Sequence, residues 1–475
     1  MNTNLVKIVF AVFVIIASGC EDSGRKNKTV NKKADIQPVK NQNAEIIKIE
    51  PGKVYKSIRC LNRPEYSYSI YLPLSYNDSV KFPVLYLFDP HAKGSEPVEK
   101  YREIADEFKM IIACSNNSKN GLSSGEINMI SYSFISDVRS RFGIDPAKVY
   151  AGGFSGGARI AVEVADMDKN IKGVIGCGAG VPNESFINKI DFNYFLTAGN
   201  KDFNYKELVK LSESLKQANV NYCFMEFDGK HEWPEPDVIK TAIYFFILNA
   251  DNEKEIDPGI IKEYKKFENK NLKDAKGRND MIEQIAIYER MVIILNKVDN
   301  TIGYKKNLKT LYTTKQWSEH KKNLAKALET ETRLQSFFRN NFASQSTGWW
   351  NDQINILIEN SKNAPTVEER LMNKRLLNYL SLVAYMYSDN ALKNGKLAEA
   401  QNYLFIYEKV DPENTEVYYL KAVYYAMQNR KDLALDELKK AVKLGFDDFE
   451  RIYKDSHFTF GDAEIQSIIN EGGKS

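Results

Sequence analysis

Histidine and cysteine are both scarce in this sequence. Of its 475 residues, 4 are histidines and 5 are cysteines, so chemistry that depends on histidine has few candidate residues. No two cysteines form a Cys-x-x-Cys pair, which excludes the usual spacing of a zinc ribbon or a thioredoxin-like site. Cys114, Cys177 and Cys223 lie in or beside apolar runs and are expected to be buried core residues.

The chain also lacks an excess of charge and a long apolar segment. Its 66 Lys and Arg residues nearly balance 63 Asp and Glu, so no nucleic-acid partner is expected. The apolar run at residues 8–17 is too short to span a bilayer as a helix, and no later segment is long enough. A length of 475 residues exceeds one ordinary hydrophobic core and predicts at least two domains.

The first residues have the layout of a secretory signal peptide: Lys7 precedes the apolar run, which ends in small residues. The stretch Ala17-Ser18-Gly19-Cys20 resembles the bacterial lipobox, and a plain signal peptide with an incidental cysteine is the alternative. The resemblance implies a signal peptide over 1–19 and lipidation of Cys20. The protein would then be anchored to a membrane of the bacterial cell envelope, facing the periplasm or the exterior. Residues 20–45 are polar and are predicted to form a flexible tether.

Residues 46–250 alternate between short apolar runs and helix-like segments. The segment 66–72 alternates apolar and polar residues and predicts an antiparallel strand. Continuous apolar runs predict buried parallel strands at 83–88, 110–114, 148–152, 171–176, 192–197 and 222–227. Helices are predicted between them at about 97–108, 125–142, 156–167, 203–218 and 235–249. This alternation predicts an α/β domain with a mostly parallel sheet, whose active site forms at the carboxyl ends of the strands.

A Gly-x-Ser-x-Gly motif at 153–157 stands between a predicted strand and a predicted helix. In that context the serine occupies a strained turn that lifts its hydroxyl above the sheet, and the flanking glycines leave the room that the turn needs. We therefore interpret Ser155 as a nucleophile, and the N–H of Gly156 as a donor to the oxyanion that develops on attack. The alternative is an ordinary serine in a glycine-rich turn.

A serine hydroxyl needs a base, and His231 is the best candidate because it follows the last predicted strand. Asp202, after the strand 192–197, is the candidate to orient the imidazole, and the order Ser, Asp, His is that of the hydrolases. Each residue also has a structural interpretation: His231 as a cap of the last helix, and Asp202 as a cap of the helix 203–218. Glu226 and Asp228 are rival acids, although Asp228 is so close to His231 that it more naturally shapes the turn.

Residues 60–250 resemble the α/β-hydrolase superfamily, particularly esterases related to polyhydroxybutyrate depolymerases, dienelactone hydrolases and feruloyl esterases. The resemblance is carried by GGFSGGAR at 152–159, the element Gly199–Asp202 and GKHEWP at 229–234. It implies an α/β-hydrolase fold, with Ser155, Asp202 and His231 as the catalytic residues and Gly156 as an oxyanion donor. The second oxyanion donor is expected from the loop at 89–92, through the N–H of His91 or Ala92, because Pro90 has none. This loop departs from the usual His-Gly of the family.

Helical periodicity replaces strand signals after a break at 249–259, which predicts a helical domain over 255–475. Long helices are predicted near 258–275, 277–297, 312–341 and 366–393. Small and large apolar residues then recur with a period of about 34 residues. This pattern resembles tetratricopeptide repeats at about 381–414 and 415–448, with a generic helical bundle as the alternative. The resemblance implies a protein partner bound on a concave face.

Two classes of function follow. In the first, the chain is a serine hydrolase that cleaves a small ester or acylated substrate and needs no metal or organic cofactor, with a serine peptidase as a variant of the same chemistry. In the second, the hydrolase domain is catalytically silent and the chain is a scaffold of the cell envelope that binds a partner through its helical repeats. The unusual loop at 89–92 favours the second class.

Overall fold

The computed structural model describes residues 48–251, 256–459 and 461–472, which form two compact units divided between Trp317 and Ser318. The predicted signal peptide, Cys20 and the predicted tether lie outside the described residues. Within the described ranges, no helix combines the length and the apolar character needed to cross a membrane.

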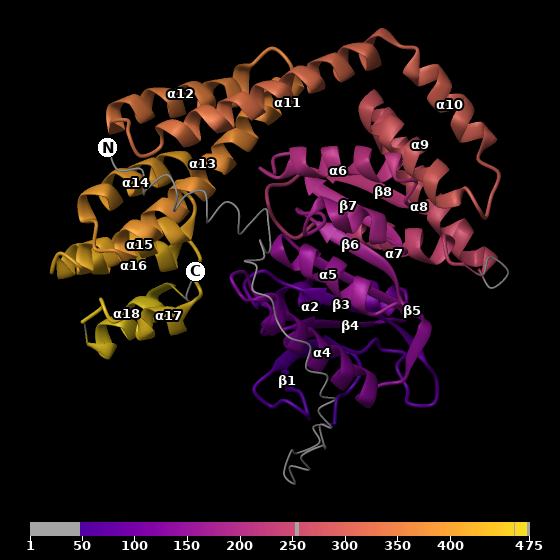
Figure 1. The fold of residues 1–475 in the computed structure, drawn as a ribbon, viewed down its shortest axis with the longest axis horizontal. Helices are drawn as coiled ribbons and strands as arrows, with labels where there is room; N and C mark the ends of the chain where they lie inside the picture. Colours follow the sequence, from indigo (N-terminus) through magenta and orange to yellow (C-terminus); the bar gives the residue numbers. More distant parts are fainter. Residues whose placement is uncertain (1–47, 252–255, 460, 473–475) are drawn as a thin grey trace, which may run out of the picture. The chain divides into compact units, whose positions relative to one another are not determined.

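The first unit is built around an eight-stranded sheet with the order β1-β2-β4-β3-β5-β6-β7-β8 (Figure 1). The pairs β1–β2 and β2–β4 are antiparallel, and all the other neighbours are parallel. The strands are β1 (Val54–Arg59), β2 (Ser67–Tyr71), β3 (Phe82–Phe88), β4 (Ile111–Ser115), β5 (Ile144–Phe154), β6 (Ile171–Cys177), β7 (Asn193–Gly199) and β8 (Tyr222–Phe227). Every predicted strand overlaps an observed one, because continuous apolar runs are what a sheet covered on both faces requires.

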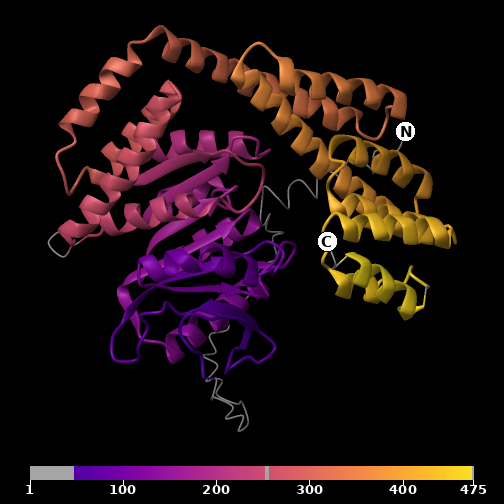
Figure 2. The same cartoon turned by 180° about the vertical axis from the view of Figure 1, so that it is seen from behind.

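The sheet has helices on both faces (Figures 1 and 2). Helices α4, α5 and α6 pack on one face, whereas α2, α3 and α7 pack on the other. Their bounds are α2 (Ser95–Lys100), α3 (Arg102–Glu107), α4 (Ser124–Arg141), α5 (Gly156–Met167), the 3₁₀ helix η1 (Glu184–Lys189), α6 (Tyr205–Gln217) and α7 (Pro236–Leu248). The predicted helix at 97–108 is therefore two short helices.

Three further helices belong to the first unit: α8 (Pro258–Gly277), α9 (Met281–Leu295) and α10 (Ile302–Tyr312). Their apolar side chains share one core cluster with α7 and β8, in which Ile285 and Ile287 of α9 are buried together with Cys223 and Phe245. The sequence pattern predicts that the first folded domain spans residues 46–250. The compact unit ends instead at Trp317, because these helices bury their apolar faces against the sheet domain rather than against the helices that follow.

A buried ion pair joins α8 to α9. Glu268 is fully buried and accepts two hydrogen bonds of 3.1 Å from Arg290, which is 7% exposed. Replacing Glu268 by alanine will lower the free energy of unfolding by about 3–5 kcal/mol, because it leaves an unpaired guanidinium in the core. Chemical denaturation followed by circular dichroism measures this loss.

The control for that variant is Glu283→Ala, which removes an exposed ion pair with Arg278 from α9, the helix that carries Arg290. It is expected to cost about 1 kcal/mol or less, because exposed pairs contribute little. Equal losses in the two variants would contradict a structural role for the buried pair.

The second unit is helical in all of its described elements: α11 (Lys315–Asn341), which begins in the first unit, α12 (Thr347–Asn363), α13 (Val367–Lys393), α14 (Leu397–Val410), α15 (Thr415–Ala426), α16 (Lys431–Lys443), α17 (Phe449–Lys454) and α18 (Asp462–Gly472). Helix α13 packs on α14, and α15 packs on α16, as two helical hairpins. Several apolar residues that follow the period of about 34 residues are buried in the two hairpins, among them Ala384, Ala400, Ala422, Ala434 and Leu438.

Candidate active site

Ser155 follows β5 directly and precedes α5, so it lies at the carboxyl edge of the sheet. Its backbone has φ 52° and ψ −122°, a conformation that costs energy in any residue with a Cβ. The turn is held by a hydrogen bond of 2.8 Å from the Ser155 N–H to the carbonyl of Cys177, at the end of β6. The sequence prediction of a sharp turn between strand and helix is confirmed.

Two glycines make this turn possible. A Cβ on Gly153 would lie 2.1 Å from the carbonyl oxygen of Gly157, and one on Gly157 would lie 2.0 Å from the carbonyl oxygen of Phe88. Either contact is far shorter than a van der Waals contact, so the backbone would have to move. The two glycines of the motif are therefore required because the tight turn around Ser155 leaves no room for a Cβ at either position.

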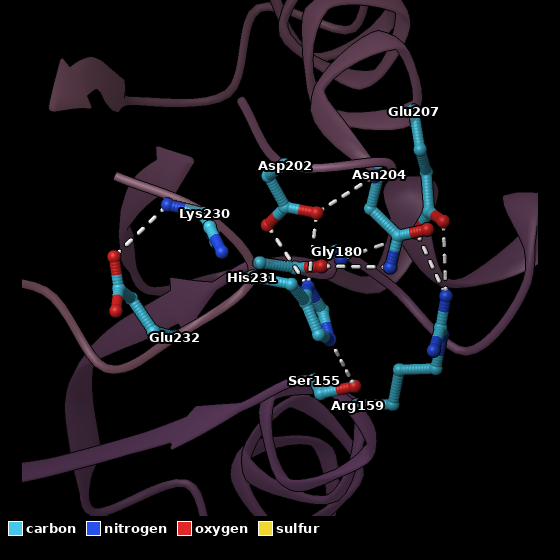
Figure 3. Close-up of polar contacts among 10 residues, drawn as sticks. Ser155, Arg159, Gly180, Asp202, Asn204, Glu207, Lys230, His231 and Glu232 are labelled. Carbon is cyan, nitrogen blue, oxygen red and sulfur yellow. Dashed lines mark hydrogen bonds and ion pairs between the residues drawn. The ribbon is translucent and has the colours of Figure 1, made fainter. Parts of the chain in front are cut away.

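Three predicted side chains meet above this edge of the sheet (Figure 3). The imidazole of His231, after β8, has its Nε2 2.9 Å from Ser155 Oγ. Its Nδ1 lies 2.9 Å from each carboxylate oxygen of Asp202, which follows β7. Asp202 is 1% exposed, whereas the His231 side chain is 17% exposed. The buried carboxylate accepts the Nδ1 proton, so Nε2 is left as the acceptor that faces the serine hydroxyl.

The surroundings of the imidazole restrict its orientation. The rings of Phe154 and Phe203 lie 4.6 and 4.3 Å from that of His231. Backbone hydrogen bonds join the loop after β7, which carries Asp202, to the loop after β8, which carries His231. One of them runs from the N–H of Lys201 to the carbonyl of Gly229 at 2.9 Å. The imidazole is thus placed by packing as well as by its two hydrogen bonds.

The rival acids lie elsewhere. Asp228 is 77% exposed at its side chain and pairs with Lys201, and Glu226 accepts a hydrogen bond from Tyr205. Asp202 does not cap helix α6 through its side chain as an N-cap residue, because that position is held by Asn204. Instead it accepts a hydrogen bond of 2.7 Å from the N–H of Asn204 while it holds His231.

Gly156 is the first residue of α5, so its N–H has no carbonyl acceptor within the helix. The two amides predicted to supply the second donor both have acceptors in the structure. The N–H of His91 donates to Asp89 Oδ1 at 2.8 Å, and that of Ala92 donates to the Asp89 carbonyl at 3.3 Å. Both amides assigned to the oxyanion from the sequence are therefore engaged, because Asp89 closes the loop on itself as a turn.

Asp89 is a site residue that sequence reasoning missed. It follows β3, is 2% exposed, and its Oδ1 also accepts from the N–H of Lys93 at 3.2 Å. Its Oδ2 accepts from Trp233 Nε1 at 2.9 Å, two residues beyond His231. A single buried carboxylate thus connects the loop after β3 with the loop that carries the imidazole. In the sequence, Trp233 stands two residues after His231, which indicates that it lies near the site. The sequence does not indicate that Asp89 accepts the hydrogen bond of its indole.

Replacing Asp89 by alanine will lower the free energy of unfolding by about 3 kcal/mol, because the buried indole N–H of Trp233 and the partly buried N–H groups of His91 and Lys93 lose their acceptor. Urea denaturation measures this value. The control, Asp228→Ala, removes an exposed carboxylate and is expected to change stability by about 0.5 kcal/mol or less. A loss below about 1 kcal/mol in Asp89→Ala would show that the carboxylate does not hold the two loops together.

A second layer of polar contacts supports the loop that follows β6 (Figure 3). Arg159 Nη2 lies 2.9 and 3.0 Å from the two carboxylate oxygens of Glu207, and the same carboxylate accepts from the N–H of Gly180. Asn204 Nδ2 donates to the carbonyl of Gly178 at 2.9 Å. These bonds join helices α5 and α6 to the loop that packs against Asp202 and His231.

In the part of the chain that the structure describes, no three His, Cys, Asp or Glu side chains are grouped to hold a metal ion. Cys60, Cys114, Cys177 and Cys223 are buried and unbridged. Burial raises the pKa of the Cys60 thiol to about 12, and it also raises the pKa of Cys114, Cys177 and Cys223. The prediction that the last three are core residues is confirmed, and none of these thiols is poised as a nucleophile.

The sheet is parallel from β4 to β8 with β2 antiparallel beside β4, and the strained serine turn after β5 lies between a strand and a helix, as in the nucleophile turn of α/β-hydrolases. The first unit is therefore a mostly parallel α/β sheet with helices on both faces, in agreement with the fold that the sequence resemblance implies. No family model matches the sequence, and no curated protein matches it. Many solved structures are similar to part of the chain.

A ferulic acid esterase is 16% identical, with 40% of this chain and 95% of that chain covered and a TM-score of 0.34. An S-formylglutathione hydrolase from Staphylococcus aureus is 16% identical, with 41% and 94% covered and a TM-score of 0.32.

Proposed function

We propose that the first unit is a serine hydrolase that cleaves carboxylic esters through an acyl-enzyme. One observation carries the proposal: the unbroken sequence of contacts from Ser155 Oγ through His231 to Asp202. Ser155 Oγ attacks the acyl carbon while His231 Nε2 takes the hydroxyl proton. The tetrahedral oxyanion forms beside the N–H of Gly156, and His231 then returns the proton to the departing alcohol. Water, deprotonated by the same imidazole, releases the acid and restores the serine.

Asp202 has an electrostatic role in this scheme. When His231 becomes an imidazolium, the buried carboxylate 2.9 Å away stabilises the positive charge without taking the proton itself. Ester rather than peptide cleavage is favoured by the likeness of GGFSGGAR and GKHEWP to esterase segments, which is an analogy between sequences.

A panel of p-nitrophenyl esters, from acetate to octanoate, tests the proposal with purified protein. Turnover above the uncatalysed rate supports an esterase. Turnover of aminoacyl p-nitroanilides in place of the esters would assign the same site to a peptidase.

The second candidate function, a catalytically silent scaffold, is favoured by one observation: the amides of His91 and Ala92 are both engaged by Asp89. A hydrolase site with a single oxyanion donor would be a poor catalyst. Absence of turnover across the whole panel, in protein that is folded by circular dichroism, would favour the scaffold.

We further propose that the protein is a lipid-anchored component of the bacterial cell envelope, modified at Cys20. The proposal rests on the sequence alone, on the apolar run and the small residues before Cys20. Metabolic labelling with an alkyne-bearing fatty acid is expected to mark the wild-type chain and not a Cys20→Ala variant. Equal labelling of the two would contradict it.

We also propose that the second unit is a tetratricopeptide-like stack that binds a protein partner. Its support is the burial of apolar residues that follow the period of about 34 residues in α13–α16, together with a cavity of about 640 Å³ bordered by Tyr385, Tyr419 and Arg451. A photocrosslinking residue at Lys393, an exposed side chain on this border, is expected to capture a partner in cells. Capture that is as frequent from the distant exposed position Lys362 would contradict binding at the cavity.

A further inference from the structure

The loop between β4 and α4 lies against both parts of the proposed oxyanion site. Its backbone is joined to the loop after β3 by a bridge between Lys119 and His91, and by a hydrogen bond of 2.9 Å from the N–H of Asn120 to the carbonyl of Pro90. Asn120 is therefore held in register beside the loop from which the second oxyanion donor was expected.

The side chain of Asn120 packs on Gly156, the residue that follows the nucleophile. A Cβ built on Gly156 would lie 1.9 Å from Asn120 Oδ1 and 3.6 Å from Nδ2, so the amide occupies the space that a side chain at position 156 would fill. Asn120 is exposed, and within the described part of the chain its side-chain amide has no hydrogen-bond partner. An unpartnered primary amide thus lies beside the N–H that receives the oxyanion.

The backbone of the loop after β3 supplies no second donor to the oxyanion, so a side-chain amide could take that role. The N–H groups of His91, Ala92 and Lys93 all point to Asp89, and Pro90 has no N–H. A primary amide carries two N–H donors, and a half-turn about its Cβ–Cγ bond exchanges the oxygen that faces Gly156 for the NH₂ group. A developing negative charge favours the donor end of the amide.

We propose that Asn120 supplies the second oxyanion donor through its side-chain amide, together with the N–H of Gly156. The inference rests on the proposed hydrolase function. It explains why the residue after Ser155 is glycine: any side chain at 156 would displace the amide that completes the site. It also explains how the chain dispenses with the backbone donor of the loop at 89–92.

Kinetics of the Asn120→Ala variant test the inference, because alanine keeps the backbone bond to Pro90 and removes only the amide. We expect kcat for the best p-nitrophenyl ester to fall by about 10²- to 10³-fold with KM changed by less than about threefold. Binding of a trifluoromethyl ketone, which forms the tetrahedral adduct, is expected to weaken by about the same factor as kcat/KM. Lys119→Ala, the neighbouring exposed position, is the control and is expected to retain wild-type kinetics.

A second variant separates the oxyanion role from a general effect on the loop. Gly156→Ala places a methyl group where the amide lies, and is expected to lose activity to a similar extent. The double variant is expected to be no slower than Asn120→Ala alone, because the methyl group then displaces nothing. Additive losses in the double variant, or a kcat for Asn120→Ala within about threefold of wild type, would overturn the inference.

The failure of the inference is distinguishable from that of the proposed function. If the wild type hydrolyses esters and Asn120→Ala does so equally well, only the assignment of Asn120 fails. If the wild type hydrolyses no ester and its serine does not react with a phosphonate, both fail together.

Discussion

Replacing His231 by alanine will lower kcat for a short p-nitrophenyl ester by about 10⁵- to 10⁶-fold, equivalent to about 7–8 kcal/mol of transition-state stabilisation. The serine hydroxyl is almost fully protonated at neutral pH, and the imidazole 2.9 Å away is the only described side chain with a base nitrogen in contact with it. Without that base, the serine hydroxyl must lose its proton to water, which is unfavourable at neutral pH. The leaving alcohol also receives no proton.

The measurement is steady-state hydrolysis corrected for background, with stability checked by thermal unfolding. His457→Ala is the matched control, because this histidine is also paired with an aspartate but is 41% exposed and belongs to the second unit. It is expected to leave kcat unchanged. A loss of less than about 100-fold in the His231 variant would show that another group takes the proton.

Replacing Asp202 by asparagine will lower kcat by about 10³- to 10⁴-fold. The amide is nearly isosteric and keeps an acceptor for the Asn204 N–H, so the loop is expected to persist. Its NH₂ group, however, favours the imidazole tautomer with the proton on Nε2. That nitrogen then faces Ser155 as a donor and cannot accept the hydroxyl proton. The negative charge that stabilises the imidazolium is lost as well.

The controls for this variant are Asp228 and Glu226, the two other acids that the sequence offered to orient His231. Asp228→Asn and Glu226→Gln change carboxylates that lie near His231 in the chain but contact Lys201 and Tyr205 instead. Both are expected to stay within about threefold of the wild-type kcat. If Asp228→Asn were as slow as Asp202→Asn, the imidazole would be oriented by a different acid in solution.

The placement of the three side chains could be predicted because it depends on topology. Consecutive parallel strands present their carboxyl ends at one edge, so residues that follow β5, β7 and β8 must lie near one another. The turn at Ser155 could also be predicted, because two glycines at this spacing indicate a turn with no room for a Cβ. Local spacing and strand order together were enough to find these contacts.

Other features depend on contacts between distant residues and left no local signal. The bond between Asp89 and Trp233 joins positions 144 residues apart, so neither residue reveals the other. The loop at 89–92 was expected to expose an amide, but Asp89 accepts the N–H of His91 with its side chain and that of Ala92 with its backbone carbonyl. Asn120 was not singled out because its position against Gly156 comes from the bridge between two loops.

In the fold, too, features with a local sequence signal could be predicted, whereas features that depend on distant contacts could not. Strand β1 was not predicted, because it is an edge strand with several exposed residues and no apolar run. Helices α8 and α9 were predicted, but they were assigned to the second domain, because periodicity reports that a helix has an apolar face and not what covers it. The tetratricopeptide-like assignment of α13–α16 stays a prediction.

The most direct test of the account is the site of covalent modification by an alkyl fluorophosphonate. Such a reagent reacts with a serine only when a neighbouring base activates the hydroxyl and donors stabilise the adduct. The account predicts one adduct per chain, located at Ser155 by mass spectrometry of the digested protein and absent from Ser155→Ala and His231→Ala. Equal modification of the wild type and Ser155→Ala, or no modification of folded wild-type protein, would contradict it.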